Sequence, residues 1–438
     1  MKKLWLILLF FTTMANATLR IELTKGMNAA IPIAVVPFAN EQNNMPNDAN
    51  ITNIITTDLQ NSGAFRVKTP GLLSQIPTQA AAVDFSYWRN QAVNDVVIGQ
   101  VQALGDDRYT ISFQLVDLYA NTKQNAQDAI LLNESFSAKK QALREVAHHI
   151  SDLIYEKLTG VRGIFNTKIA YVLVQRFADQ PAKYQLVVAD QDGFHPQTLL
   201  VSNQPIMSPT WMPSGRALAY VSFEKHHSAI YLQTLANGER YLISRFSGIN
   251  GAPAFSPDGN SMALVLTRTG TSSPNLYVMN LQSKKITQLT NDVAIDTEPV
   301  WSHDGKTLFF TSSRAGGPQI YRYHFATNQI ERITFDGDYN ARACLTPHDH
   351  AMVVLHRDDQ GYNIAQQDLS TGRLTVLTQS GKNDSPSLAP NGKMILYGTR
   401  ENGRSVLGLV SLDGRVKLRL PSPEGGVQDP AWSPYLTK

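Results

Sequence analysis

The chain has 438 residues, of which 42% are hydrophobic and 17% are charged, and its only cysteine is Cys344. This length exceeds what one ordinary core organises and predicts two or more domains. The 39 Lys and Arg residues against 36 Asp and Glu residues leave a net charge of +3, which is too small to indicate a nucleic-acid partner. A single cysteine excludes an intramolecular disulfide, so Cys344 is expected to be a packing residue.

The N-terminal residues predict export. Two lysines precede an apolar run from Leu4 to Phe11, and Ala-Asn-Ala follows at 15–17. This order is typical of a secretory signal peptide, and the run is too short to span a membrane. We therefore predict a signal peptide over 1–17 and a mature chain that begins at Thr18 and carries no transmembrane segment.

The mature chain opens with a strand pattern. Leu19, Ile21 and Leu23 alternate with polar residues, as in a half-buried strand. One interpretation is an edge strand of the first domain. The other is a docking segment that pairs with the sheet of another protein.

Residues 18–160 predict a mixed α/β domain of ordinary size. The apolar run Pro32 to Phe38 indicates a strand buried on both faces. Alternation at 96–104 and 109–118 predicts a β-hairpin. The remaining expected elements are helices at 47–61, 84–92 and 139–158, the last ending at Gly160, and a short strand at 65–67.

From about residue 161 the chain repeats one pattern, which we call the anchor: Pro, any residue, a large apolar residue, then a tight turn. Pro299-Val-Trp-Ser-His-Asp-Gly305 and Pro253-Ala-Phe-Ser-Pro-Asp-Gly259 are two of six copies. The large residues stand 43 to 46 positions apart, a period typical of β-propellers. These residues are Trp211, Phe255, Trp301, Leu345, Leu388 and Trp432.

The two ends of the repeat region complement each other. Strand patterns at 169–174, 184–189 and 198–201 form a first repeat without an anchor, whereas the last anchor, at 429–435, has no strands after it. Combining them predicts a six-bladed propeller over 161–438, closed by the C-terminal strand. Closure removes exposed sheet edges, so loss of the last ten residues is predicted to unfold the ring.

No motif for a nucleophile elbow, a phosphate-binding loop or a cysteine-based zinc site occurs. His348, His350 and His356 are the candidate metal or catalytic group, and a secreted lyase-like or peptidase-like propeller enzyme that uses them stays open. A carbohydrate-binding propeller is a third interpretation, although Tyr339 is the main aromatic residue in the relevant loops. We expect no cofactor and no metal.

The connections that lead into the innermost strands gather at one mouth of a propeller and predict a binding face. Here they span 204–208, 248–252, 296–298, 339–342, 382–385 and 426–429. One cation per blade lies in loops on the same face, which indicates either an acidic partner or six solvated strand ends. These cations are Arg176, Lys225, Arg268, Arg314, Arg357 and Arg400.

With these features the chain resembles the TolB family, the periplasmic components of the Tol–Pal systems of Gram-negative bacteria. The resemblance rests on the signal peptide, the Pro32–Phe38 segment within an α/β domain, and the anchor repeats. It is strong at Ser385–Gly392 and Pro430–Leu436 and covers essentially the whole mature chain. The chain departs from the family pattern in the degenerate anchor around Leu345, which lacks the initial Pro and the final Gly, and in the aliphatic Leu388.

The resemblance implies a periplasmic monomeric scaffold and not an enzyme. Such a scaffold binds the peptidoglycan-associated lipoprotein Pal at a propeller mouth and TolA through its N-terminal segment, Thr18 to Ala29. It supports outer-membrane constriction at division and envelope integrity, and bacteriocin peptides exploit the lipoprotein contact. The implied Pal-binding residues are Ile249, Asn250, Ala252, Thr297, Glu298 and Arg342. The implied TolA-binding residues are Thr18, Leu19, Arg20, Ile21, Glu22, Leu23, Thr24 and Lys25.

Overall fold

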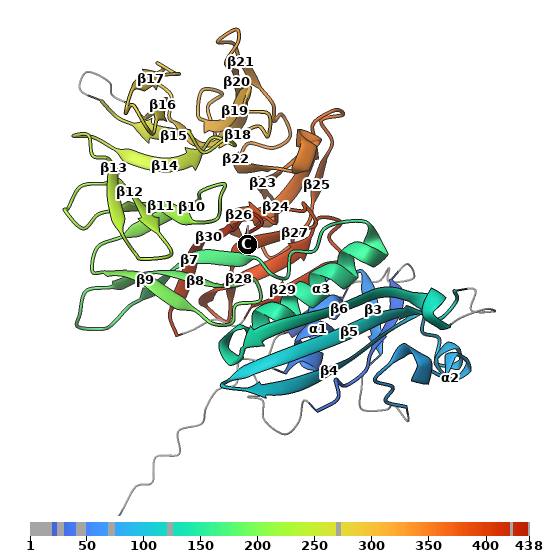
Figure 1. The fold of residues 1–438 in the computed structure, drawn as a ribbon. Helices are drawn as coiled ribbons and strands as arrows, with labels where there is room; N and C mark the ends of the chain where they lie inside the picture. The colour runs from blue at the N-terminus through green and yellow to red at the C-terminus, as the bar shows by residue number, and fades with distance from the viewer. Residues whose placement is uncertain are drawn as a thin grey trace, which may run out of the picture.

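The chain folds into an N-terminal α/β region and a β-propeller, which lie against each other in Figure 1. This computed structural model describes residues 20–23, 30–40, 50–68, 75–120, 126–268, 273–420 and 424–436. The predicted signal peptide at 1–17 lies outside these ranges. Within them, no helix is long and apolar enough to cross a membrane.

The α/β region is built on a five-stranded sheet of order β3-β2-β4-β5-β6. Strand β2 (Ile31–Val35) lies between β3 (Phe65–Lys68) and β4 (Asp95–Gly105) and pairs in parallel with both. Both faces of β2 are covered, as its continuous apolar sequence predicted. The predicted hairpin is β4 with β5 (Arg108–Asp117), and β6 (Ile130–Lys139) adds an edge strand that the sequence analysis missed.

Helices cover both faces of this sheet. On one face lie α1 (Ile51–Asn61) and α3 (Leu143–Thr159), and on the other lies the short α2 (Phe85–Asn90). Helix α1 begins after Asn50, whose side chain accepts a hydrogen bond from the backbone N–H of Asn53 at 2.7 Å. Helix α3 begins later than expected because the preceding residues complete β6 and a 3-10 turn, and it ends at Gly160 in the left-handed conformation.

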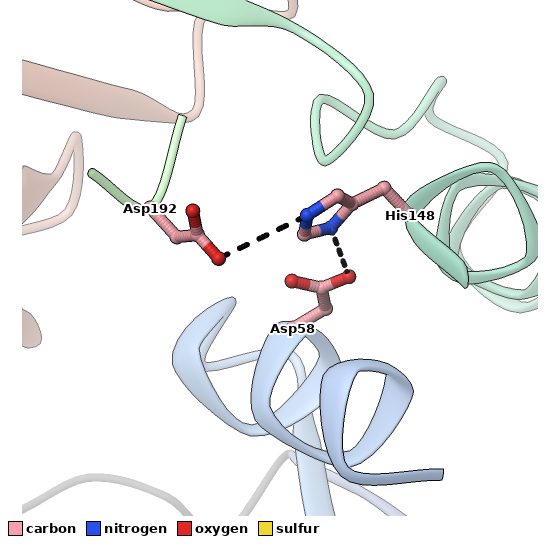
Figure 2. Close-up of side chains that lie close together, drawn as sticks. All are labelled: Asp58, His148 and Asp192. Carbon is pink, nitrogen blue, oxygen red and sulfur yellow. Dashed lines mark hydrogen bonds and ion pairs between the residues drawn. The ribbon is translucent and has the colours of Figure 1, made fainter. Parts of the chain in front are cut away.

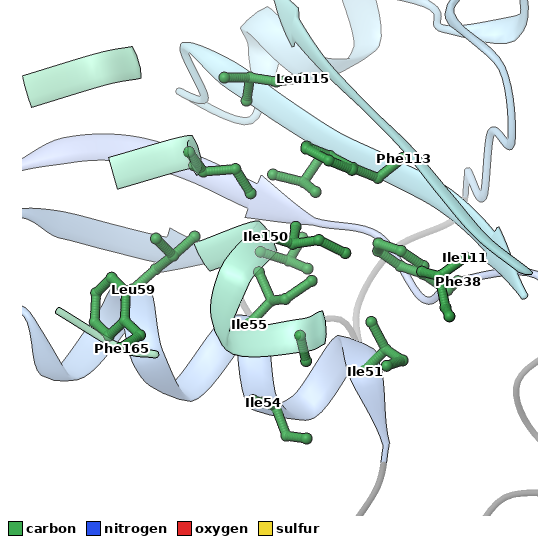
Figure 3. Close-up of a cluster of buried hydrophobic side chains, with 14 of the residues drawn as sticks. Phe38, Ile51, Ile54, Ile55, Leu59, Ile111, Phe113, Leu115, Ile150 and Phe165 are labelled. Carbon is green, nitrogen blue, oxygen red and sulfur yellow. The ribbon is translucent and has the colours of Figure 1, made fainter. Parts of the chain in front are cut away.

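The core beneath α1 and α3 is shown in Figure 3. Ile51, Ile55 and Leu59 recur at helical spacing along α1 and are fully buried. They meet Ile150 of α3 and Phe113 of the sheet. Each such side chain contributes about 1.5–3 kcal/mol through burial, so this face holds both helices on the sheet.

The propeller has six blades of four antiparallel strands. Its first blade is β30-β7-β8-β9, so the C-terminal strand becomes the innermost strand of blade one, as predicted. The strands of blades one to three are β30 (Gly426–Trp432), β7 (Lys168–Gln175), β8 (Lys183–Asp190) and β9 (Gln197–Ser202); β10 (Ile206–Trp211), β11 (Ala217–Ser222), β12 (Ala229–Thr234) and β13 (Arg240–Ser244); β14 (Asn250–Phe255), β15 (Ser261–Leu266), β16 (Asn275–Asn280) and β17 (Ile286–Gln288).

Blades four to six follow the same plan in chain order. Their strands are β18 (Asp296–Trp301), β19 (Thr307–Ser312), β20 (Gln319–His324) and β21 (Ile330–Arg332); β22 (Asn340–Leu345), β23 (Ala351–Asp358), β24 (Gly361–Asp368) and β25 (Leu374–Val376); β26 (Asp384–Leu388), β27 (Met394–Glu401), β28 (Arg404–Ser411) and β29 (Val416–Arg419).

The large residue of every anchor ends an innermost strand. Trp301 shows why this position is large: its indole Nε1 donates a hydrogen bond to the carbonyl of Ala254 in the preceding blade, at 3.1 Å. In the turn that follows, Ser302 donates to Asp304 at 2.7 Å and Gly305 takes a positive φ of 69°. The anchor therefore joins one blade to the next and reverses the chain.

Blade six carries a fifth strand from the far end of the sequence. β1 (Arg20–Leu23) pairs antiparallel with β29, with Ile21 opposite Leu418. The interpretation of this segment as an edge strand of the first domain is therefore wrong, because it adds to the outer edge of a propeller blade. A β-sheet edge accepts such a strand through backbone hydrogen bonds, whatever its side chains are.

Candidate functional site

The innermost strands share an unusual backbone feature at the channel. In each of the six blades, the residue three positions before the anchor's large residue lies within a β-bulge and has a positive φ, between 43° and 54°. None is glycine, and such conformations cost about 1–3 kcal/mol each. These residues, which we call the channel ring, are Ser208, Ala252, Glu298, Arg342, Ser385 and Asp429.

The channel ring lines one cavity of about 440 Å³ and is tied together by polar contacts. Arg342 Nε lies 3.0 Å from Glu298 Oε1, and Arg342 Nη1 lies 3.3 Å from Asp429 Oδ1. Asp429 also accepts hydrogen bonds from Ser385 Oγ and from the backbone N–H of Ser208, both at 3.2 Å. These contacts link blades four, five, six, one and two, and strain that is held by such a network points to a functional position.

Electrostatics make Arg342 the centre of the ring. Burial lowers the pKa of Arg342, but the carboxylates of Glu298, Asp384 and Asp429 outweigh it and raise this pKa above its usual value. The side chain of Arg342 remains one-third exposed and that of Glu298 about one-quarter exposed, at 33% and 26%. Both charged groups therefore reach the open channel, where a partner can contact them.

The structure places the six implied Pal-binding residues in two different roles. Ala252, Glu298 and Arg342 belong to the channel ring, Thr297 precedes Glu298 on β18, and Ile249 is exposed at the mouth. The side chain of Asn250 is fully buried and accepts hydrogen bonds from Ser244 Oγ and the backbone N–H of Phe246, at 2.7 and 2.8 Å. Asn250 therefore shapes its loop and is not positioned for contact with a partner.

Exposed apolar residues precede the innermost strands of three blades, and three of these residues were not predicted. Ile249 is 49% exposed, Val293 85%, Ile295 52% and Phe335 69%. All four stand in the connections that lead into the innermost strands of blades three, four and five. The signal available in the sequence was an apolar residue between polar ones in a loop, as at Phe335. We call these four residues the apolar rim.

The six predicted loop cations do not form a uniform ring. Arg314 pairs with the buried Asp296 at 2.8 Å, Arg357 pairs with Asp338, and Arg268 stacks over Phe246 at 5.4 Å. Arg176, Lys225 and Arg400 make no ion pair among the described residues. Of these, Arg176 and Arg400 line one cavity of about 560 Å³ between blades one and six. Free positive charge is therefore confined to part of the mouth.

The candidate histidine trio is split between the two ends of one hairpin. His348 and His350 lie at the turn between β22 and β23, in and beside a short 3-10 helix (Pro347–Asp349). His356 lies at the other end, where it pairs with Asn340 and is hydrogen-bonded to its side chain at 2.9 Å. The three residues do not form one metal or catalytic site.

The implied TolA-binding segment is only partly described. Arg20 to Leu23 form β1 on blade six, whereas Thr18, Leu19, Thr24 and Lys25 lie outside the described residues. The pairing satisfies backbone groups of β1 that a partner's sheet would otherwise use. In this position the segment is paired with a strand of the chain's own propeller.

Comparison with known proteins agrees with this architecture. The family model described as the TolB amino-terminal domain matches residues 19–125, and that of the TolB beta propeller domain matches residues 155–436. A Tol-Pal system protein TolB from Coxiella burnetii (strain RSA 493 / Nine Mile phase I) is 53% identical over 430 residues, which cover 98% of this chain and 97% of that protein. A protein of the same name from Hamiltonella defensa is 41% identical over 99% of both chains.

A solved structure supports the same assignment. The crystal structure of TolB from Acinetobacter baumannii superimposes with a TM-score of 0.84 at 40% identity, and the match covers 95% of this chain and all of that one. Both the sequence relatives and this structure span the α/β region and the propeller together. The chain therefore belongs to the TolB family of Tol–Pal system proteins.

Proposed function

We propose that this Tol–Pal component is a periplasmic, non-catalytic scaffold that binds Pal at the propeller mouth and TolA through residues 18–29. In this proposal residues 18–160 form the first domain and 161–438 the propeller. The observation that carries it is the juxtaposition of the channel ring with the apolar rim. An exposed apolar patch beside positioned charges is the composition of a protein-binding surface.

The mouth offers both affinity and specificity. The apolar rim supplies area that gains free energy when it is removed from water. Glu298 and Arg342 are held in fixed positions by each other, at 3.0 Å, so they select a partner of complementary polarity at little entropic cost. Bacteriocin peptides that carry the same groups would compete for this mouth.

The N-terminal segment supplies the second contact. While β1 is paired with β29, its backbone is unavailable to TolA, so binding of TolA requires release of the strand. If Pal favours one of these two states, Pal and TolA change each other's affinity by the same factor. The scaffold then connects the outer-membrane lipoprotein to TolA in support of membrane constriction at division and envelope integrity.

The proposal is tested by capture of Pal from detergent-solubilised envelope with the mature chain, 18–438, as bait. We expect Glu298→Lys and Phe335→Ser each to reduce capture at least about tenfold, equivalent to about 1.4 kcal/mol. Glu134→Lys, a matched charge reversal at an exposed position on β6, is expected to capture Pal as the wild type does. Thermal melting first establishes that each bait is folded.

Two results would contradict the proposal. If the folded wild-type bait does not capture Pal, the mouth is not a Pal site. If a chain that begins at Ala30 binds purified TolA as tightly as the mature chain does, the N-terminal segment is not the TolA contact. The coupling between the Pal and TolA sites is tested by measuring TolA affinity with and without saturating Pal. Equal affinities would exclude this coupling.

A further inference from the structure

A buried polar cluster lies where the α/β region meets the propeller. Asp58 of α1 and His148 of α3 face Asp192, which follows β8 in blade one (Figure 2). Asp58 is 3% and His148 2% exposed, and the Asp192 side chain is 13% exposed. Groups this polar are rarely buried without a specific partner.

One buried nitrogen of the cluster, His148 Nε2, makes no hydrogen bond. His148 Nδ1 lies 2.8 Å from Asp58 Oδ2, a normal hydrogen bond. His148 Nε2 faces Asp192 Oδ2 at 3.8 Å, too far for a hydrogen bond, and this buried nitrogen makes none. An orphaned nitrogen that is aimed at a carboxylate across such a gap has the arrangement of two ligands that share an ion.

The geometry points to a site for a divalent transition-metal ion of the zinc class, bound by His148 Nε2 and the Asp192 carboxylate. Asp58 orients the imidazole: by accepting the Nδ1 proton it leaves the lone pair on Nε2 for the metal, the usual carboxylate–histidine–metal arrangement. A nitrogen and an oxygen that each bind zinc at about 2.0–2.2 Å lie at most roughly 4 Å apart, which the 3.8 Å separation satisfies. One ligand atom from each of the three residues lies within 4.8 Å of the others.

A cavity beside the cluster provides room for the remaining coordination. It has a volume of about 40 Å³ and is lined by Asp58, Asn61, Gln191 and Asp192, among others. A water molecule needs roughly 10–15 Å³ on this measure. The Asn61 side-chain oxygen is also buried without a hydrogen-bond partner. The cavity can therefore hold water that bridges the ion and Asn61.

Basic side chains already surround the carboxylates, so a metal ion must compete for its place. Asp58, Asp190 and Asp192 are contacted by Arg144, Lys168, His148 and His195. Arg144 contacts both Asp190, at 3.0 Å, and Asp192, so it competes with a metal ion for Asp192. Arg144 keeps its bond to Asp190 when the ion binds, so the competition lowers the affinity for the ion but does not prevent binding.

The site would join the two parts of the molecule. His148 and Asp58 belong to helices of the α/β region, whereas Asp192 belongs to the propeller. An ion that binds both sides stabilises this one relative placement of the two, and by mass action it raises the melting temperature of the assembled chain.

The test is zinc titration of the mature chain after dialysis against a chelator. We expect one Zn²⁺ per chain, a higher melting temperature with Zn²⁺, and visible absorption bands when Co²⁺ is used as the probe. Asp58→Asn is expected to weaken binding about tenfold, as for other orienting carboxylates, and His148→Gln and Asp192→Asn to weaken it more. His350→Gln, at an exposed histidine of the propeller, is the control for adventitious surface binding.

The outcomes separate clearly. Loss of the Co²⁺ spectrum in His148→Gln and Asp192→Asn, with wild-type behaviour of His350→Gln, supports the site. Absence of stoichiometric binding to the folded wild type overturns it, as does binding that both variants retain. Asp192→Asn preserves side-chain shape, and its melting temperature in chelator shows whether the metal-free fold is intact.

Discussion

The indole Nε1 of Trp211 donates a hydrogen bond to the carbonyl of Ala431 at 3.0 Å, although 220 residues separate them. The contact repeats the one between Trp301 and Ala254, which joins blade four to blade three. The seam where the two ends of the chain meet is therefore built like an ordinary boundary between blades. Ring closure thus uses contacts that the repeat already contains.

Removal of β30 is expected to abolish cooperative folding of the propeller. A chain that ends at Gly425 leaves β7 without its innermost neighbour and Trp211 without Ala431. Circular dichroism during heating should then show a broad transition at a lower temperature. A chain that ends at Ser433 keeps β30 and serves as the control; equal melting of both chains would show that closure contributes little.

Arg342→Met is expected to lower the free energy of unfolding by about 1–3 kcal/mol. The partly exposed guanidinium separates Glu298 from Asp429, so its loss leaves two carboxylates without their counter-charge. Arg342→Lys keeps the positive charge but loses the planar guanidinium that contacts Glu298 and Asp429 through different nitrogens. We therefore expect an intermediate decrease in the free energy of unfolding. Urea denaturation measures both, and a Met variant as stable as the wild type would contradict the role of the ring network.

Asp95 is expected to make stability fall as the pH rises through neutrality. Burial first, and then the charge of Asp117 opposite it on β5, raise the pKa of Asp95 to about 7. The unfolded pKa is about 3.9, so between these values the folded state holds the extra proton. Stability from this group is present at pH 4 and is lost as the pH passes 7.

Asp95→Asn therefore should stabilise the protein at pH 8, on the order of 2 kcal/mol, and have little effect at pH 4. Chemical denaturation at both values measures the difference. Asp117→Asn, which removes only the smaller cause, should give a smaller gain. A gain from Asp95→Asn that is equal at both pH values would rule out titration as its origin.

The double variant Ile21→Pro, Glu22→Pro is expected to release β1. Alternate residues of an antiparallel strand donate to the partner, so one of two adjacent prolines removes a hydrogen bond of the ladder. Amides of β29 that face β1 should then exchange with deuterium at least about tenfold faster, because they lose their partners. Glu22→Ala, which retains the N–H, should exchange as the wild type does, and unchanged exchange in the double variant would exclude the pairing.

The family resemblance implied three residues of the channel ring, but the sequence revealed neither the ring as a whole nor the buried polar cluster of Asp58, His148 and Asp192. Ser208, Glu298 and Asp429 each precede a proline, a context that favours extended backbone, so the sequence does not predict their positive φ. His148 and Asp58 lie 90 positions apart on separate helices, and only the packing of α1 against α3 brings them into contact. Such relationships have no periodic signature.

The sequence by itself determined the number of blades and their closure, because every blade buries the same positions at a period of 43 to 46 residues and the incomplete first and last repeats fit only each other. Tertiary structure decided where the N-terminal strand lies. The alternation of Leu19, Ile21 and Leu23 predicts a strand but does not identify its partner, since strand pairing is made by backbone groups that every residue carries. Which outer blade edge the segment joins, here that of β29, depends on how the whole chain has folded.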